Sequence, residues 1–350
     1  MIRLEPRVSS PLWLTLSAPV TAVIAAFLLC GLLIMWTGEP VFEAYALLLK
    51  GAAGSRFALT ETLTRATPMI LTGLAAAIAF RAKLWNIGGE GQFYAGALMA
   101  TWIGTGAVTL PPWLMIPFLM IMGALAGGGL LLIPTILKNR LKVDEVVTTL
   151  LLNFIVLLFV NYLLEGPLKD PMSMGWPQAA PIIDEGVLPS ILAKSRVHLG
   201  LVIALVAAVL AWVIMRFTVW GYEIRAVGFN AAAAAFAGIG VNRTIVLTAL
   251  LSGGLAGMAG VSEVAGTKGY LTLDLSPGFG YAGIAVAMLA ALHPLAVVLS
   301  ALFLSGIFVG ADSMSRALNV PTYISDVIVA TSVLAVLVSM MFTRFRLRLG

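Results

Sequence analysis

Charged residues are scarce in this sequence of 350 residues, since only 11% are Asp, Glu, Lys or Arg and the mean hydropathy is +1.02. Soluble globular domains average about 25% charged residues, so this composition excludes a soluble protein. Cysteine is almost absent, because Cys30 is the only one, which excludes an internal disulfide and a cysteine-based metal site. Since 60% of the residues are hydrophobic and a spanning helix takes about 20 residues, the chain can form about ten membrane helices.

The residues and motifs of common catalytic sites are also missing. The two histidines, His198 and His293, lie far apart without an HExxH motif, and His293 precedes a proline as a loop residue would. No nucleophile and base are recognisable, so an intramembrane enzyme is disfavoured. The sequence has no GxxxxGK[ST] phosphate loop, so the chain cannot hydrolyse ATP itself. No metal and no cofactor is expected in this chain.

Apolar windows account for most of the sequence. The first, Leu12 to Trp36, is longer than the core of a cleavable signal peptide, so we interpret it as an uncleaved first helix. The predicted spans are 12–36, 67–80, 93–110, 113–136, 146–164, 199–217, 244–262, 278–292, 294–311 and 323–343. These windows predict an all-α membrane protein with about ten transmembrane helices.

The net charge of +5 is explained by membrane topology rather than by nucleic-acid binding. With the N-terminus inside, the inner segments carry 13 of the 21 basic residues and 5 of the 16 acidic ones. This puts both termini in the cytoplasm. We expect a cytoplasmic segment 1–18, a single transmembrane domain 19–343 with outer segments 38–66 and 165–198 and a cytoplasmic loop 218–243, and a cytoplasmic tail 344–350.

The two outer segments have different compositions. In 38–66, Phe42, Tyr45, Leu48 and Leu49 are spaced as on one helix face, which predicts an amphipathic surface helix. Segment 165–198 has five prolines and four acids, which predicts an ordered cap rather than a span. A soluble partner could dock on this cap, or it could be an ordinary connecting loop.

A short pattern occurs twice in the chain. Residues 91–96 and 278–283 both read GxxYAG, and each copy follows a glycine-rich helix, at 71–79 and 251–260. Five predicted spans separate the copies, so one runs inward where the other runs outward. This predicts an inverted repeat of the kind found in many transporters, with the substrate passing at the repeat interface.

Glycine pairs four residues apart recur in the predicted spans. They occur at Gly123 and Gly127, Gly253 and Gly257, and Gly306 and Gly310. Such spacing lets helix backbones approach closely. It predicts tight helix packing, and it would also suit helices that slide or rock.

Polar residues interrupt the apolar pattern between the second and third spans. The residues singled out there are Asn86, Gly88, Gly89, Glu90, Gln92 and Tyr94. We expect a broken or re-entrant backbone, because glycine pairs allow positive φ and such backbone is tolerated at membrane depth only inside protein or along a water-filled path. Glu90 could line the path, could belong to a polar hinge, or could pair with Arg81 or Lys83 at the cytoplasmic interface.

Two asparagines share nearly one face of the fifth span. Asn153 and Asn161 are eight residues apart, which leaves about 80° of rotation between them. They could hydrogen-bond between helices or line a pore.

The cytoplasmic loop carries helix start and stop signals. Asn230 can cap a short helix over 231–237, which Gly238 then ends. A short alanine-rich helix is marginal alone in water, so something should pack on it. Either a cytoplasmic subunit or the protein's own helix ends could do so.

Several segments together resemble one family. They are NIGGEGQ at 86–92, VDEVVTTLLLNFI at 143–155, GYEIRAVGFNAAAAAFAGI at 221–239, SGGLAGMAG at 252–260, and GFGYAGIAVAMLA at 278–290 followed by HPLAVVLSALF. In this order, over roughly residues 60–310, the chain resembles permease subunits of bacterial ABC importers for nucleosides and simple sugars. Gly89 stands where such relatives often have alanine.

The resemblance implies a ten-helix type II importer subunit in the bacterial inner membrane. Its implied partners are a second permease, two cytoplasmic ATPase subunits that bind ATP and Mg, and a periplasmic or lipid-anchored substrate-binding protein. It implies that the 218–243 loop couples to the ATPase. The matching residues are Arg225, Ala226, Gly228, Asn230, Ala234, Ala235 and Gly238.

The main alternative is an ion-coupled secondary transporter that uses the inverted repeat, with Glu90 as its proton or sodium site. Such a carrier would not need the alanine-rich cytoplasmic helix. The substrate, whether nucleoside, purine, pentose or hexose, is not disclosed by these motifs, and none of them identifies a substrate-binding residue.

Overall fold

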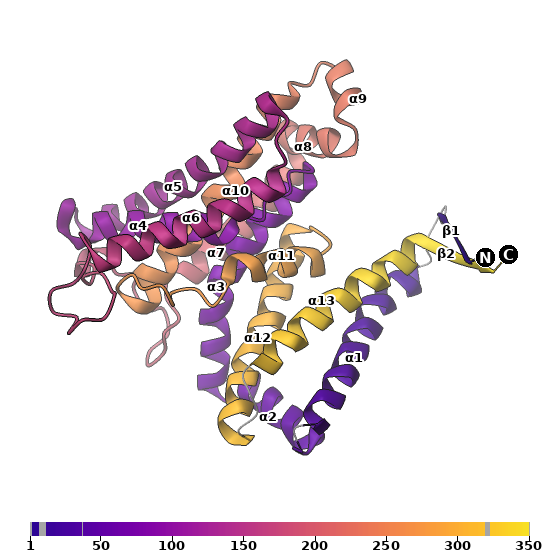
Figure 1. Ribbon diagram of the computed structural model, residues 1–350, viewed down its shortest axis with the longest axis horizontal. Coiled ribbons are helices and arrows are strands. Elements are labelled where there is room, and N and C mark those ends of the chain that lie inside the picture. The colour runs from indigo at the N-terminus through magenta and orange to yellow at the C-terminus, as the bar shows by residue number, and fades with distance from the viewer. Residues whose placement is uncertain (1, 7–11, 37, 319–322, 350) are drawn as a thin grey trace. The chain divides into compact units, whose positions relative to one another are not determined.

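The computed structural model describes residues 2–6, 12–36, 38–318 and 323–349, and most of them are helical (Figure 1). The chain divides into two compact units. The terminal unit comprises Met1–Thr62 and Leu302–Gly350, and the central unit comprises Leu63–Ala301. Two helices, α3 (Arg56–Arg81) and α12 (Pro294–Leu318), continue from one unit into the other.

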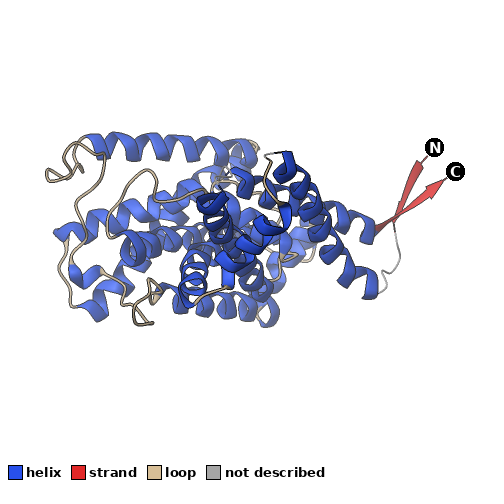
Figure 2. Cartoon of the chain, turned by 90° about the horizontal axis from the view of Figure 1, so that it is seen from below, coloured by secondary structure: helices blue, strands red, loops and turns tan. Residues whose placement is uncertain are grey.

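In the terminal unit the two ends of the chain meet. Strand β1 (Ile2–Pro6) pairs antiparallel with β2 (Phe345–Leu349), which Figure 2 shows in red. The helices next to these strands, α1 (Leu12–Trp36) and α13 (Tyr323–Arg344), pack along each other. This pairing places both termini together.

Segment 38–66 contains helix α2 (Val41–Ala53) and the first turns of α3. The segment therefore contains a helix, as expected. Its buried residues are Ala44 and Leu48, whereas Phe42 is 92% exposed and Leu49 is 66% exposed. Side chains that face lipid on a helix at the membrane surface would be exposed in this way, so the amphipathic surface helix stays a prediction.

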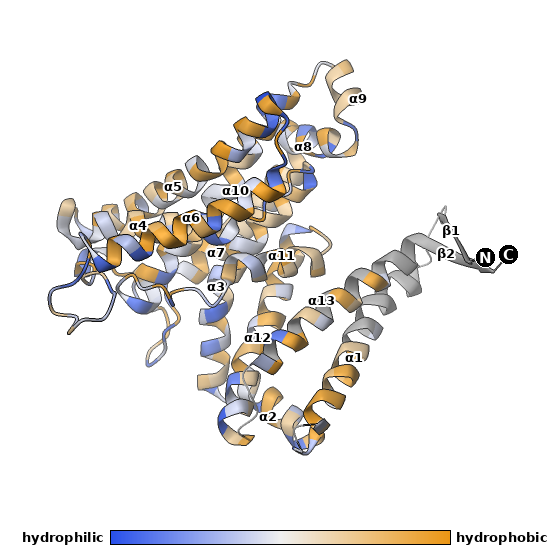
Figure 3. Ribbon diagram, viewed as in Figure 1, coloured by the Kyte–Doolittle hydropathy of each residue, from blue (hydrophilic) through white to orange (hydrophobic). Residues whose placement is uncertain are grey.

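The central unit holds the remaining elements. They are α4 (Gly89–Trp102), the π-helix η1 (Ile103–Ala107), α5 (Pro112–Leu141), α6 (Glu145–Glu165), the 3-10 helix η2 (Asp184–Gly186), α7 (Gly200–Phe217), α8 (Val219–Phe229), α9 (Ala231–Phe236), α10 (Val241–Glu263), the π-helix η3 (Val264–Lys268) and α11 (Phe279–Leu289). Figure 3 shows that α5 and α6 are hydrophobic along most of their length. Side chains such as Phe154, Ile155 and Leu158 are more than half exposed, as expected on a lipid-facing helix.

Six helices of the described chain are long and apolar enough to cross a membrane, or seven if α1 and α2 form one broken span. The six include α3, α5, α6, α7 and α12, and α10 with its continuation η3. The chain is thus a multi-pass membrane protein, but the expected count of ten spans is not confirmed. Helix α11 has 11 residues, about 16 Å, roughly half of a bilayer core.

The core of the central unit is built on glycine contacts between α4, α5 and α10. An added Cβ at Gly123 or Gly127 of α5 would collide with α10, and one at Gly253 or Gly257 of α10 would collide with the backbone of α5. On α4, Gly96 meets the Gly257 carbonyl in the same way. The small residues therefore let three helix backbones touch, which confirms the tight packing predicted from their spacing.

The proline-rich segment after α6 is an ordered cap, as predicted. Its backbone amides of Ile182 and Leu188 donate hydrogen bonds to the carbonyls of Gly269 and Ala265 at 2.9 and 2.8 Å. These bonds fix the cap over η3 and the loop that follows it. The structure describes every residue between α6 and α7, and the longest helix there is η2.

Candidate functional site

The backbone between α3 and α4 is broken, as the sequence predicts. Helix α3 ends at Arg81, α4 begins at Gly89, and the residues between them are not helical. The expected reason for the glycines is wrong, since the positive φ falls on Lys83 (54°) while Gly88 has φ −81°. The glycines permit close approach instead, because a Cβ on Gly89 would lie 3.2 Å from the Gly280 carbonyl oxygen.

Asn86 and Gln92 form a reciprocal amide pair across this break. The Asn86 Nδ2 donates to Gln92 Oε1 at 2.9 Å, and the Gln92 Nε2 donates to Asn86 Oδ1 at 2.8 Å. Asn86 also donates to the Ser252 hydroxyl of α10 at 3.1 Å, which donates to the Ala75 carbonyl of α3 at 2.8 Å. The buried pair therefore ties the break to two long helices.

Asn153 of α6 caps the start of α4. Its Oδ1 accepts from the Gly91 amide at 2.8 Å, and its Nδ2 donates to the Ile87 carbonyl at 2.9 Å and to the Tyr281 hydroxyl at 3.2 Å. The first amides of a helix lack partners within the helix, so this side chain supplies one from a neighbouring helix. Its role is interhelical bonding, which was one of the two alternatives for this residue.

Glu90 caps the start of α11. Its Oε2 accepts a hydrogen bond from the Gly280 amide at 2.7 Å, and the Ser276 hydroxyl and Tyr281 amide also bond to the carboxylate. Glu90 is only 3% exposed, and among the described residues it makes no ion pair. Pairing with Arg81 or Lys83, one of the three possibilities raised by the sequence, is therefore not observed.

Tyr94 completes the cluster. Its hydroxyl donates to the Leu273 carbonyl and accepts from the Ser276 amide, both in the loop before α11. The structure thus brings Asn86, Glu90, Gln92, Tyr94 and Asn153 into one buried cluster, which we call the polar hub. Ser252 and Tyr281 lie in segments that the sequence analysis quotes, but their patterns did not predict that these hydroxyls and that of Ser276 would bond to the cluster.

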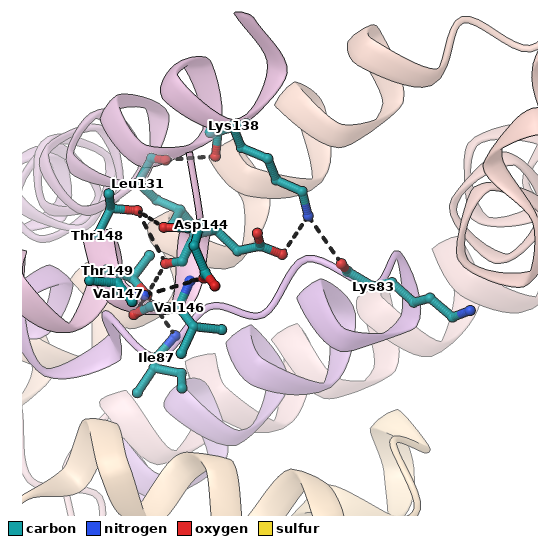
Figure 4. A network of polar contacts seen from close by, with 11 residues as sticks. Lys83, Ile87, Leu131, Lys138, Asp144, Val146, Val147, Thr148 and Thr149 are labelled. Carbon is teal, nitrogen blue, oxygen red and sulfur yellow. Dashed lines mark hydrogen bonds and ion pairs between the residues drawn. The ribbon is translucent and has the colours of Figure 1, made fainter. Parts of the chain in front are cut away.

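A second polar network lies beside the hub where α5 meets α6 (Figure 4). Lys138 of α5 pairs with Glu145 of α6 and donates to the Lys83 carbonyl at 3.3 Å. Asp144 caps α6 by accepting from the Val146 amide at 2.7 Å, and the Thr149 hydroxyl accepts from the Ile87 amide at 3.3 Å. The VDEVVTT segment therefore caps the start of α6 and bonds to the backbone of the chain before α4.

The short helix expected in the 218–243 loop is present as α9. Asn230 caps it by accepting from the Ala233 amide at 3.1 Å, and Gly238 follows it with φ +84°. Ala234 is buried, whereas Phe229 and Phe236 are 83% and 96% exposed. The sequence did not single out these two phenylalanines, although exposed aromatic residues in a loop are a usable signal of a partner surface.

Helix α8 packs on the protein's own helix ends. An added Cβ at Gly228 would collide with the Arg81 carbonyl at the end of α3. Ile224 packs in a small core with Ala82 and Met215, and Trp220 lies against them. Helix α8 is therefore in direct contact with the ends of α3 and α7.

A buried histidine lies at the other end of the central unit, in the cap. The His198 Nδ1 accepts from the Gly200 amide at 3.1 Å, and its Nε2 lies 3.3 Å from the Thr267 hydroxyl. Burial lowers the pKa of His198 to about 4. The neutral ring therefore acts as a structural link between the cap and η3.

Comparison with known proteins places most of the chain in one family. Residues 58–337 match the family described as branched-chain amino acid transport system, permease component. A guanosine ABC transporter permease protein, NupP of Bacillus subtilis, is 38% identical over 92% of each chain. A glucose ABC transporter permease protein, TsgB13 of Haloferax volcanii, is 34% identical over 99% of this chain and 93% of its own.

A nucleoside ABC transporter permease protein, NupB of Lactococcus lactis, is 32% identical over 89% of this chain and 88% of its own. Among solved structures, PsaBC from Streptococcus pneumoniae in complex with Fab has a similar fold, with a TM-score of 0.50 and 13% identity. The match covers 85% of this chain and 95% of that one.

Proposed function

The chain belongs to the permease family named after branched-chain amino acid transport, and on that premise we propose that it forms the translocation path of a nucleoside importer. It is a membrane-spanning permease subunit of an ABC transporter, a class that works with ATPase and substrate-binding partners. The observation that carries the substrate class is the 38% identity to a guanosine permease over 92% of both chains. A simple sugar is the second candidate, because a glucose permease is 34% identical.

The polar hub is proposed as a hinge of this path rather than as its substrate site. Each of its side chains already has hydrogen-bond partners within the protein, and Asn86, Glu90 and Asn153 are at most 3% exposed. A group that binds substrate needs donors or acceptors left open for it. Gly88 and Gly89 belong to this hinge, where the backbone approaches neighbouring segments closely.

The repeated GxxYAG pattern also supports a hinge at the hub. Both GxxYAG copies lie at helix starts, one in α4 and one spanning the start of α11. The two helix starts touch at Gly89 and Gly280, and Glu90 of the first caps the second. This is the place where two related halves of a transporter would move against each other.

Energy is proposed to enter through α8 and α9. Phe229 and Phe236 would seat in a groove of a cytoplasmic ATPase, and Gly228 would pass the motion to α3. The residues proposed to form this coupling loop are Arg225, Ala226, Gly228, Asn230, Ala234, Ala235 and Gly238. This needs the basic, α9-bearing side to face the cytoplasm.

The assembly is proposed to contain a second permease, two ATPase subunits and a substrate-binding protein, in a bacterial inner membrane. Both termini would lie in the cytoplasm. The pairing of β1 with β2 supports this, because it places the two ends on one side, and so does the inner location of most basic residues.

The test is uptake by the purified complex in proteoliposomes, with a panel of labelled nucleosides, nucleobases, pentoses and hexoses. We expect ATP-dependent uptake of a nucleoside, in competition with unlabelled guanosine. Uptake that continues after ATP depletion and follows an ion gradient would reject this function in favour of a secondary transporter. Uptake of sugars alone would replace the substrate but keep the importer.

A further inference from the structure

A cavity of about 250 Å³ lies in the central unit where three membrane-crossing helices begin or end. Its lining includes Arg81, the last residue of α3, Arg216, the next-to-last residue of α7, and Pro294, the first residue of α12. Helices that cross a bilayer start and stop near its headgroups. The cavity therefore lies at headgroup depth.

The cavity is strongly positive. Arg225 of α8 and His293 also line it, and none of its described lining residues is a carboxylate. Within the described chain, Arg81, Arg216 and Arg225 form no ion pair. The three guanidinium groups therefore have no ion-pair partner in the described chain and can bind an anion from outside it.

The Arg81 side chain is held in place inside this cavity. Its Nε donates to the Leu292 carbonyl at 3.2 Å, which leaves its other N–H groups for a ligand. Arg225 is close enough for its charge to act on Arg81. A guanidinium group that is fixed and faces a second one suits the planar, bidentate recognition of a phosphate group.

An apolar stripe of α7 leads from the membrane to this cavity. Val202, Leu205 and Val209 are 41%, 39% and 49% exposed, and the spacing of three and four residues continues through Trp212 to Arg216. From Val202 to Arg216 the stripe is about 21 Å long, which is more than one leaflet of the hydrocarbon core. Trp212 lies near its end, at the depth where tryptophan is enriched in membrane proteins.

We infer that this cavity binds the phosphate group of an anionic phospholipid, with an acyl chain along the α7 stripe. The charge selects a phosphate group, and the stripe selects a molecule that has both a phosphate group and a lipid tail. Soluble phosphates share the first feature only. The inference goes beyond the proposed function and does not depend on the substrate. Arg225 belongs both to this cavity and to the proposed coupling loop.

The test compares lipids on the full-length permease in detergent. Native mass spectrometry gives the dissociation constants of phosphatidylglycerol and phosphatidylcholine for the wild type, Arg216→Gln and the control Arg140→Gln. Both arginines are exposed near the end of a helix, but only Arg216 lines the cavity. Arg225 is left unchanged because of its proposed place in the coupling loop.

We expect phosphatidylglycerol to bind more tightly than phosphatidylcholine, and Arg216→Gln to weaken phosphatidylglycerol binding about fivefold. Arg140→Gln should leave it within about twofold of the wild type. Equal losses in the two variants, or equal binding of the two lipids, would overturn the site. Displacement of the lipid by glycerol 3-phosphate or inorganic phosphate at similar concentration would overturn the lipid in favour of a soluble phosphate compound.

Discussion

Removing the Asn153 side chain tests whether the polar hub holds the fold. The variant Asn153→Ala leaves the Gly91 amide and the Ile87 carbonyl without their partners, and it removes the bond to the Tyr281 hydroxyl. An orphaned buried backbone group costs about 1–3 kcal/mol, so two of them cost about 2–6 kcal/mol. Interhelical hydrogen bonds in membrane proteins average about 0.6 kcal/mol, so the loss of three would cost about 2 kcal/mol. This value agrees with the lower end of the expected loss of stability.

The assay is thermal unfolding of the purified protein in detergent, beside the control Asn161→Ala. Asn161 lies on the same helix and has no side-chain hydrogen bond to the described residues. We expect a clear fall in Tm for Asn153→Ala. For Asn161→Ala we expect the free energy of unfolding to change by less than about 0.5 kcal/mol, and Tm to change little. Equal Tm values for the two variants would refute the assignment of Asn153 as a cap of α4.

Three further changes probe other parts of the structure. Glu90→Gln keeps an acceptor for the Gly280 amide but brings an NH₂ group to a site where the surrounding groups donate hydrogen bonds. We expect the free energy of unfolding to fall by about 1–3 kcal/mol and uptake to be slower. Unchanged uptake kinetics and an unchanged Tm would contradict the role of Glu90 in the hinge. Gly257→Val should prevent close packing of α5 on α10 and lower the yield of folded protein, whereas Gly129→Val, whose Cβ would meet nothing within 4 Å, should fold normally. The pKa of His198 is about 4 in the folded protein, so the unfolded chain binds more protons below pH 6.5. The free energy of unfolding should therefore fall by up to about 3 kcal/mol as the pH drops to 4. A profile of Tm against pH identical to that of His198→Gln would contradict this.

Features that depend on local residue chemistry could be predicted from the sequence. The break between α3 and α4, the Asn230 cap, the ordered proline-rich segment and the glycine packing of α5 on α10 all follow from residue chemistry within a few positions. Each depends on short-range geometry, in which a cap or a close contact has a recognisable residue type.

The sequence could not predict features that depend on which distant segments meet. Gly88 and Gly89 gave a correct break for the wrong reason. Gly88 lies against Thr149 and Gly89 lies against Gly280, which is almost 200 positions away in the sequence. The structure does not confirm all ten apolar windows as spans, since hydropathy cannot distinguish a half-length helix such as α11 from one that crosses the bilayer. The sequence left three possible roles open for Glu90, and none of them identified the start of α11 as the segment that its carboxylate caps.

The most direct test of the account measures transport and ATP hydrolysis together in proteoliposomes that hold the complete complex. The double variant Phe229→Ser, Phe236→Ser removes the exposed aromatic surface beside α9 and is compared with Trp176→Ser, an exposed aromatic in the cap. The account predicts that the double variant folds with a normal Tm but transports far less nucleoside for each ATP hydrolysed, while the control keeps the wild-type ratio. An unchanged ratio in the double variant would contradict the claim that this permease is driven through α8 and α9.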